Sequence, residues 1–218
     1  MTAPHPASGP PQRVVLEGRY VRLEPLALAH LDGLWAASTE ADGQERYRWL
    51  YDEPPRSREE LAAWIGFASR SNDPLYYAIV DQATGRCVGR QSYLRIVPND
   101  GVIEVGGIFW GPSMARSRLA TEALYISARY AFETLGNRRF EWKCNNRNEP
   151  SKRAAERFGF TFEGLFRQHT IQKGENRDTA WFSMLDSEWP SRKAGFEAWL
   201  APANFDAAGM QKSRLTFA

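Results

Sequence analysis

Two arginines stand where residues 110–123, WGPSMARSRLATEA, pass from a strand-like run into a helix-like one. The first turn of a helix leaves backbone N–H groups without a partner and carries the positive end of the dipole, so it binds phosphate. Arg116 and Arg118 add positive charge, and the Thr121 hydroxyl falls within that first turn. The segment therefore predicts a phosphate site. A solvated helix start with exposed arginines is the open alternative.

The loop differs from the classical phosphate loops, which use glycine to bring the backbone close to the anion. It contains no glycine between Gly111 and Gly136. Neither GxxxxGK[ST] nor GxGxxG occurs anywhere in the chain, and this excludes P-loop and Rossmann folds.

The hydrophobic pattern and the turn residues predict the elements around this loop. Ser57 and Glu60 form a capping box at one helix start, and Gly136-Asn137 ends the long helix. The paired Gly106 and Gly107 indicate a bulge or a close approach of another backbone. Strands are predicted in two short pieces around Glu17-Gly18 and over 74–81, 87–97, 102–110, 139–144, 160–163, 167–172 and 178–185, and helices over 27–38, from 57, over 119–135, 151–158 and 189–200.

This order predicts one α/β (α+β) domain over residues 13–200, with a mixed, mostly antiparallel central sheet and helices on both faces. The strand–helix–strand unit around the long helix joins parallel neighbours, whereas the preceding hairpins are antiparallel. Residues 1–12 hold four prolines and predict a disordered tail. Residues 201–218 are expected to form a loosely held C-terminal tail, and residues 174–177 a turn.

Composition excludes several function classes. The chain has 218 residues, 43% hydrophobic residues and a net charge of +2, which suits one packed core and not a nucleic-acid binder. Two cysteines and three scattered histidines give no zinc spacing, so no metal is expected. The chain shows no signal peptide and no long apolar span, so a cytoplasmic protein without a membrane partner is expected.

Several motifs together resemble the GCN5-related N-acetyltransferase (GNAT) superfamily, and most closely its ribosomal-protein N-terminal acetyltransferase-like (RimJ/RimL-like) branch. The resemblance covers roughly residues 14–189. Five residues stand at the spacing of that branch, namely Asn148, Ser151, Gly159, Phe160 and Gly164. The matching pieces are LEGRYVRLEPL, EVGGIFWGP, LATEAL, NEPSKRAAERFGFTFEGLFRQ and DTAWFSMLDSEW.

The resemblance implies transfer of an acetyl group from acetyl-CoA to a primary amine, by direct attack through a tetrahedral intermediate. The pantetheine arm would enter between the strand before the long helix and the strand after it, and the loop amides would hold the pyrophosphate. The cofactor-binding residues implied are Gly107, Ile108, Phe109, Ala115, Arg116, Ser117, Arg118, Leu119, Ala120, Thr121, Asn148 and Ser151.

The loop departs from the family pattern [QR]-x-x-G-x-[GA], because only Ala120 fits it. Ala115 replaces the Gln or Arg, and Arg118 replaces the central glycine. Backbone amides could still cradle the phosphates, with the arginines supplying charge. Alternatively, a bulky Arg118 blocks the site and leaves a non-catalytic acyl-CoA-binding protein on the same fold.

A second departure lies in the short helix, where Ala155 occupies a position at which many superfamily members have tyrosine. The branch has Ser at the Ser151 position, and the resemblance implies that this hydroxyl protonates the departing thiolate. Plain N-capping by Ser151 is the alternative. Asn148 would reach the pantetheine amides or satisfy its own loop backbone.

Amine acetylation also needs a group that accepts a proton, because a protonated amine has no lone pair to attack with. Glu104 is the first candidate for this base and Glu141 is the second. Alternatively, each is a strand residue that faces solvent and takes no part in the reaction. Cys144 is expected to be a buried, inert thiol.

Substrate choice is expected to come from residues 47–55 and 167–177. Tyr47, Trp49 and Tyr51, beside Asp52 and Glu53, could surround a cationic amine, or they could pack over the sheet edge. The acceptor would be a small-molecule or peptide amine, and the acyl group could also be larger, as in succinyl-CoA. Since dimers are common in the branch, a homodimer is an open alternative.

Overall fold

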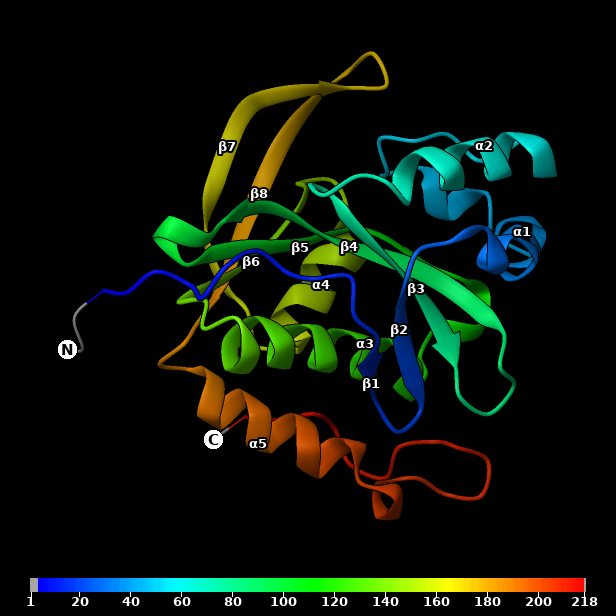
Figure 1. Ribbon diagram of the computed structural model, residues 1–218. Coiled ribbons are helices and arrows are strands. Elements are labelled where there is room, and N and C mark those ends of the chain that lie inside the picture. Colours follow the sequence, from blue (N-terminus) through cyan, green and yellow to red (C-terminus); the bar gives the residue numbers. More distant parts are fainter. Residues whose placement is uncertain (1–3, 218) are drawn as a thin grey trace.

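One eight-stranded sheet organises the computed structural model, which describes residues 4–217 (Figure 1). The strands are β1 (Leu16–Glu17), β2 (Val21–Pro25), β3 (Leu75–Asp81), β4 (Cys87–Val97), β5 (Val102–Trp110), β6 (Arg139–Asn145), β7 (Thr161–Gln172) and β8 (Glu175–Leu185). The α-helices are α1 (Leu31–Thr39), α2 (Arg58–Ala68), α3 (Arg118–Arg129), α4 (Glu149–Arg157) and α5 (Trp189–Leu200).

The strand order is β1-β2-β3-β4-β5-β6-β8-β7. Every neighbouring pair is antiparallel except β5 and β6, which are parallel and are joined through α3. The predicted mixed, mostly antiparallel sheet is therefore confirmed. Over residues 4–217, none of the helices combines the length and the apolar character that a membrane span requires.

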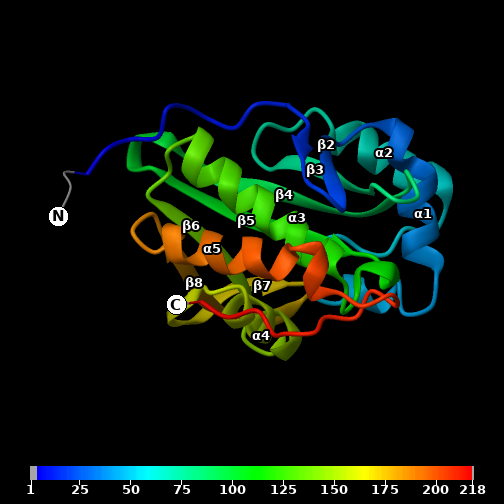
Figure 2. The same cartoon turned by 90° about the horizontal axis from the view of Figure 1, so that it is seen from below.

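Alternating side chains on β3 show which helices cover which face. Tyr77 and Ile79 belong to the core that α3, α4 and α5 complete, and we call this side the α3 face. Ala78 and Val80 belong to a second cluster that α1 and α2 complete, and we call this side the α1 face. In Figure 1, α1 and α2 lie above the sheet and α3 and α5 below it, and Figure 2 shows α3 and α5 side by side.

Three predicted boundaries can be compared with the structure. Half of the α2 capping box is confirmed, since the Ser57 hydroxyl accepts from the Glu60 N–H at 3.2 Å, whereas the Glu60 carboxylate accepts from the Arg56 N–H at 2.9 Å in place of the Ser57 N–H. Helix α4 begins at Glu149, two residues before the predicted start, because Asn148 caps it. The predicted turn over 174–177 is wrong beyond its first residue, since β8 already begins at Glu175 and pairs with Gln172.

The terminal segments are more ordered than the sequence predicts. The Ala7 N–H donates to the Pro98 carbonyl at 2.8 Å, and the Gln12 N–H donates to the Tyr130 hydroxyl at 3.0 Å. At the other end, Phe205 is buried against Trp199 at 5.1 Å between ring centroids. These contacts contradict a disordered and a loosely held tail for the described parts. Residues 1–3 and 218 lie outside the described residues.

A buried carboxylate joins α3 to the turn between β1 and β2. Glu122 accepts from the backbone N–H groups of Arg19 at 2.8 Å, Tyr20 at 2.5 Å and Val21 at 2.7 Å. Gly18 is needed in that turn, since a Cβ there would lie 2.7 Å from the Glu122 carboxylate. The start of the long helix is thereby fixed against the first hairpin.

Replacing Glu122 by Gln should destabilise the fold, because one oxygen that accepts from the backbone becomes a donor. Charged hydrogen bonds contribute about 1.5–3 kcal/mol each, so we expect the free energy of unfolding to fall by about 2 kcal/mol or more. Urea denaturation measures it. The control is Glu156→Gln, at an exposed α4 residue with no ion pair among residues 4–217. Equal stabilities of the two variants would contradict the prediction.

Candidate active site

Strands β5 and β6 part in the middle of the sheet. Their parallel register runs from Val102 opposite Arg139 to Val105 opposite Trp142 and stops there. Beyond this point β5 continues to Trp110 and β6 to Asn145 without a shared register. The backbone groups that face each other across the parted strands are therefore not used by a ladder between them.

A bulge in β5 follows directly after the last shared pair. The register against β4 shifts between Ser92–Gly106 and Arg90–Phe109, which confirms the predicted bulge at the two glycines. Gly107 has φ +57°, and a Cβ on it would lie 2.9 Å from the Ser92 hydroxyl. Only glycine takes this position without strain.

The mouth of α3 opens on the α3 face, after the end of β5. Ser117 is the N-cap, since its hydroxyl accepts from the Leu119 N–H at 3.2 Å and donates to the Met114 carbonyl at 2.9 Å. Arg116 is exposed and has φ +56°, the left-handed region that favours glycine. The tight turn is therefore made at Arg116, and Arg118 is already the first residue of the helix.

The arginines at this mouth carry charge that no acidic side chain neutralises. The Arg118 guanidinium lies over the Tyr20 ring at 4.2 Å and the Phe205 ring at 5.3 Å. Arg157, which sequence reasoning did not single out, donates from α4 to the Thr121 hydroxyl at 3.0 Å. Among residues 4–217, no carboxylate lies within 4.0 Å of Arg116, Arg118 or Arg157. Such a cluster suits an anion.

Ser151 lies in the first turn of α4, beside the end of β6. The Trp142 indole N–H donates to its hydroxyl oxygen at 3.0 Å, so the hydroxyl hydrogen can point elsewhere. N-capping by Ser151 is wrong, because the Asn148 side-chain oxygen caps the helix and accepts from the Ser151 N–H at 3.2 Å. Burial raises the pKa of the nearby Cys144 thiol and keeps it protonated.

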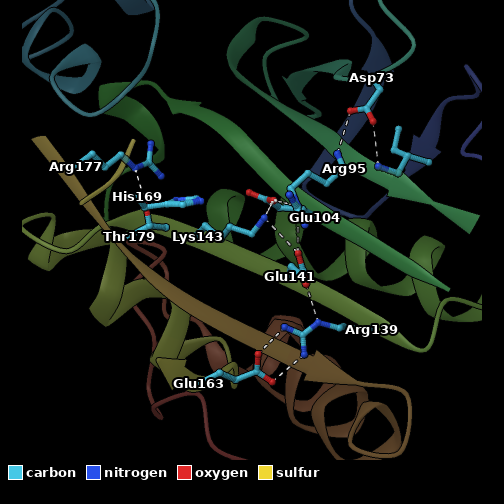
Figure 3. A network of polar contacts seen from close by, with 11 residues as sticks. Asp73, Arg95, Glu104, Arg139, Glu141, Lys143, Glu163, His169, Arg177 and Thr179 are labelled. Carbon is cyan, nitrogen blue, oxygen red and sulfur yellow. Dashed lines mark hydrogen bonds and ion pairs between the residues drawn. The ribbon is translucent and has the colours of Figure 1, made fainter. Parts of the chain in front are cut away.

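The two candidate bases face each other across β5 and β6 on the α1 face. Glu104 and Glu141 are register partners, and each is 5% exposed, so the alternative of solvent-facing residues is wrong. Lys143 lies between them, paired with Glu104 and 3.3 Å from Glu141. Arg95 lies 3.6 Å from one carboxylate and 3.7 Å from the other (Figure 3). Neither cation was expected from the sequence.

Their surroundings distinguish the two carboxylates. Burial raises the pKa of Glu104 above its ordinary value of 4.5, although Lys143 opposes the shift. Glu141 is also bound by Arg139 at 2.7 Å, and Arg139 in turn holds Glu163 with two hydrogen bonds (Figure 3). Glu141 thus has three cations around it, Arg95, Lys143 and Arg139, whereas Glu104 has two, Lys143 and Arg95.

The two segments expected to choose the substrate meet in space. The Gln172 side chain donates to the Trp49 carbonyl at 2.9 Å, and the Arg177 guanidinium lies 5.2 Å from the centre of the exposed Tyr51 ring. Tyr47 is different, since it is 3% exposed and packs on Phe109 at 4.7 Å. Tyr47 is therefore a core residue that packs beneath the rest of residues 47–55, and it is not exposed to a substrate.

A buried arginine connects this segment to the bulge. Arg90 donates to the Gly107 carbonyl at 2.9 Å, pairs with Asp52 and stacks over the Trp64 ring at 4.3 Å. Sequence reasoning missed this residue, because its partners lie 38 and 17 residues away along the chain. Within the described chain, no group of three His, Cys, Asp or Glu residues is arranged to hold a metal ion.

Parting parallel strands with a helix mouth on one face and buried carboxylates on the other define an acyl-CoA transferase fold. A family model described as "Acetyltransferase (GNAT) domain" matches residues 21–161. The chain therefore belongs to the GNAT acetyltransferase family, whose members use acetyl-CoA.

Three known proteins illustrate how similar this chain is to other acetyltransferases. A GCN5-related N-acetyltransferase from Brucella melitensis is 55% identical over 97% of this chain and 96% of its own, with a TM-score of 0.94. An uncharacterized N-acetyltransferase p20 from Bacillus licheniformis is 28% identical over 52% of this chain and 63% of its own length. RimL, a ribosomal L7/L12 alpha-N-protein acetyltransferase solved with coenzyme A, shares the fold at 20% identity, with a TM-score of 0.65 over 79% of this chain and 98% of its own.

Replacing Gly107 by Ala should lower the free energy of unfolding by at least about 1 kcal/mol, because a left-handed L-residue costs about 1–2 kcal/mol and the Cβ meets Ser92. Gly66→Ala is the matched control. Gly66 lies in α2, and a Cβ added there would have no atom within 4 Å, so this change should raise stability by about 0.8 kcal/mol. Thermal and urea unfolding of both variants compare them. A neutral Gly107→Ala would show that the bulge does not require glycine.

Proposed function

We propose that this protein transfers the acetyl group of acetyl-CoA to a primary amine, and that the cofactor and the acceptor approach from opposite faces of the sheet. The observation that carries the proposal is the parting of β5 and β6 between the α3 mouth and the buried Glu104. A molecule lying between these strands would touch both faces.

The pyrophosphate would lie on the amides of residues 115–121, at the positive end of α3. Arg116 and Arg157 supply charge, and Arg118 supplies it from its place over Tyr20. The non-catalytic alternative rests on a blocking Arg118, and a guanidinium stacked on Tyr20 and Phe205 does not favour it.

The pantetheine arm would run between β5 and β6, with the thioester near the backbone of Gly107, Ile108 and Phe109. The Asn148 oxygen already caps α4, but its NH₂ donates to none of the described residues and can reach a pantetheine carbonyl. Backbone N–H groups beside the bulge would polarise the thioester carbonyl.

In the reaction, the amine lone pair attacks the thioester carbonyl carbon and gives a tetrahedral intermediate. The intermediate collapses as the C–S bond breaks, and the thiolate takes a proton. Ser151 would relay this proton, giving its own to the thiolate and taking one back from water, since Trp142 already occupies one of its acceptor positions. The proton lost by the amine would pass to Glu104, directly or through water.

Glu104 is the preferred base because burial raises its pKa, which makes this carboxylate a better proton acceptor than an ordinary glutamate. Glu141 would hold Lys143 and Arg139 in place and thereby keep Glu104 oriented. Trp49 and Tyr51 would contact the acceptor, which is a small-molecule or peptide amine. The proposed enzyme would act in the cytoplasm, and a homodimer is the oligomeric state to test for it.

Calorimetric titration with acetyl-CoA tests the phosphate cradle. We expect micromolar binding, and Arg118→Glu should weaken it at least about tenfold, because a charged hydrogen bond contributes about 1.5–3 kcal/mol. Arg138→Glu makes the same charge change at an exposed residue before β6, far along the chain from the α3 mouth, and should bind normally. Absence of binding at millimolar acetyl-CoA would end the transferase proposal.

The pH dependence of kcat tests the base. Glu104 must be deprotonated to accept a proton, so kcat should rise with pH through a pKa above 4.5. Glu104→Gln should lower kcat by at least about 100-fold and remove this acidic limb. Glu163→Gln removes another carboxylate of the same polar network. This variant should keep the native kcat and the native acidic limb of the pH profile. An unchanged profile in Glu104→Gln would exclude Glu104 as the base.

A further inference from the structure

Arg177 is a buried cation with no acidic partner. It lies on β8, is 8% exposed, and donates to the Thr179 hydroxyl at 3.2 Å and the Gln172 side-chain oxygen at 3.3 Å. Both partners are neutral. Among residues 4–217, no carboxylate lies within 4.0 Å of its guanidinium.

The other buried cations of the α1 face all have carboxylates. Arg90 pairs with Asp52, and Lys143 pairs with Glu104 and Glu141. Burying a charge without a counter-charge is costly, so an arginine in such a place indicates a partner outside the chain. Arg177 has five N–H donors, and its contacts with neutral oxygens use two of them.

Arg177 lies at one end of a polar strip on the α1 face that leads from the candidate base. Figure 3 shows the strip, with Glu104 and Lys143 at one end and His169, Thr179 and Arg177 at the other. The Thr179 hydroxyl joins the Arg177 guanidinium to the His169 ring at 3.0 Å.

The strip holds a second donor without an acceptor. Trp181, which contacts Lys143 at 3.9 Å from its ring centre, has a buried indole N–H with no hydrogen-bond partner among the described residues. Trp181 and Arg177 are four residues apart on one strand and face the same side. Their Cα atoms are therefore about 13 Å apart along the strand. An extended peptide of about four residues covers this distance.

We propose that Arg177 binds a carboxylate of the substrate, so that the acceptor is an amine that also carries a carboxylate further along the molecule, such as a short peptide with a free C-terminus. A guanidinium binds a carboxylate with two parallel hydrogen bonds. The exposed Tyr51 ring beside Arg177 belongs to residues 47–55, which we call the acceptor segment, and the α1 face is opposite the α3 mouth. The carboxylate therefore belongs to the acceptor in preference to the acyl group. This inference rests on the proposed transferase function.

The first experiment needs no variant. Short peptides of one to four residues with a free α-amine are each compared with the matching C-terminal carboxamide as acceptors, with release of the CoA thiol as the readout, because only a longer acceptor reaches from Arg177 to Glu104. We expect kcat/KM at least tenfold higher for the acid in the best pair. Equal values for acids and amides would overturn the inference while leaving the transferase function intact.

Variants then assign the preference to Arg177. Arg177→Gln should raise KM for the acid to that for the amide, with acetyl-CoA affinity unchanged, and Arg177→Lys should keep part of the preference. Arg138→Gln, at an exposed arginine outside the two segments expected to choose the substrate, is the control and should behave as the native protein. A full preference in a folded Arg177→Gln variant would overturn the assignment.

Two further arms separate the inference from its premise. Thermal shifts with N-acetyl amino acids and their amides report carboxylate binding without turnover. A shift that needs the carboxylate and Arg177, in a protein that acetylates no amine, would support the subsite and refute the transferase. Succinyl-CoA in place of acetyl-CoA tests the acyl source: an Arg177-dependent preference for it, without acid preference in the acceptor, would overturn the acceptor assignment. Binding of no carboxylate in any arm would overturn the subsite.

Discussion

The limited pairing between β5 and β6 is the constraint on which the site depends. The strands share a register only up to Val105 and Trp142, and β5 then bulges at Gly106 and Gly107 while it stays paired with β4. Because the strands part there, side chains from both faces of the sheet lie near the same stretch of β5 and β6, where the two strands do not pair with each other. The α3 mouth and Ser151 come from one face, and Glu104 from the other.

Buried polar contacts hold this geometry in place. Arg90 joins the bulge carbonyl of Gly107 to Asp52 in the acceptor segment, so the shape of β5 and the position of that segment are mechanically linked. Lys173 extends the link, since its ammonium donates to the Tyr47 carbonyl at 3.0 Å and pairs with Glu53 at 3.1 Å. Movement of the acceptor segment would therefore reach the backbone beside the proposed thioester position.

Local patterns are sufficient to predict most of the fold, and long-range pairing explains what they miss. The bounds of β4, β5 and α5 follow from apolar alternation and turn residues, and the structure has the predicted ones. The start of α4 is misplaced because Asn148 and Ser151 are both good caps, and only the fold selects one. Glu104 can be proposed from its strand, but its partner Lys143 cannot, because their contact spans 39 residues and depends on sheet register. Arg157 is missed, and Arg177 is predicted only as part of the segment 167–177, since nothing in a sequence shows that an arginine lacks a carboxylate.

The glycine-free mouth of α3 is explained by support from distant parts of the chain. Tyr20 donates its backbone N–H to Glu122 and offers its ring to Arg118, so one residue of the first hairpin holds two residues of α3. Phe205, from the C-terminal segment, packs edge-to-face with Tyr20 and lies 5.3 Å from the same guanidinium. A glycine loop brings phosphate close by removing side chains, whereas this loop turns at Arg116 and keeps Arg118 against two rings. The bulk of the arginine is thus accommodated beside the mouth while its charge stays there, so the proposed phosphate site does not need the glycine.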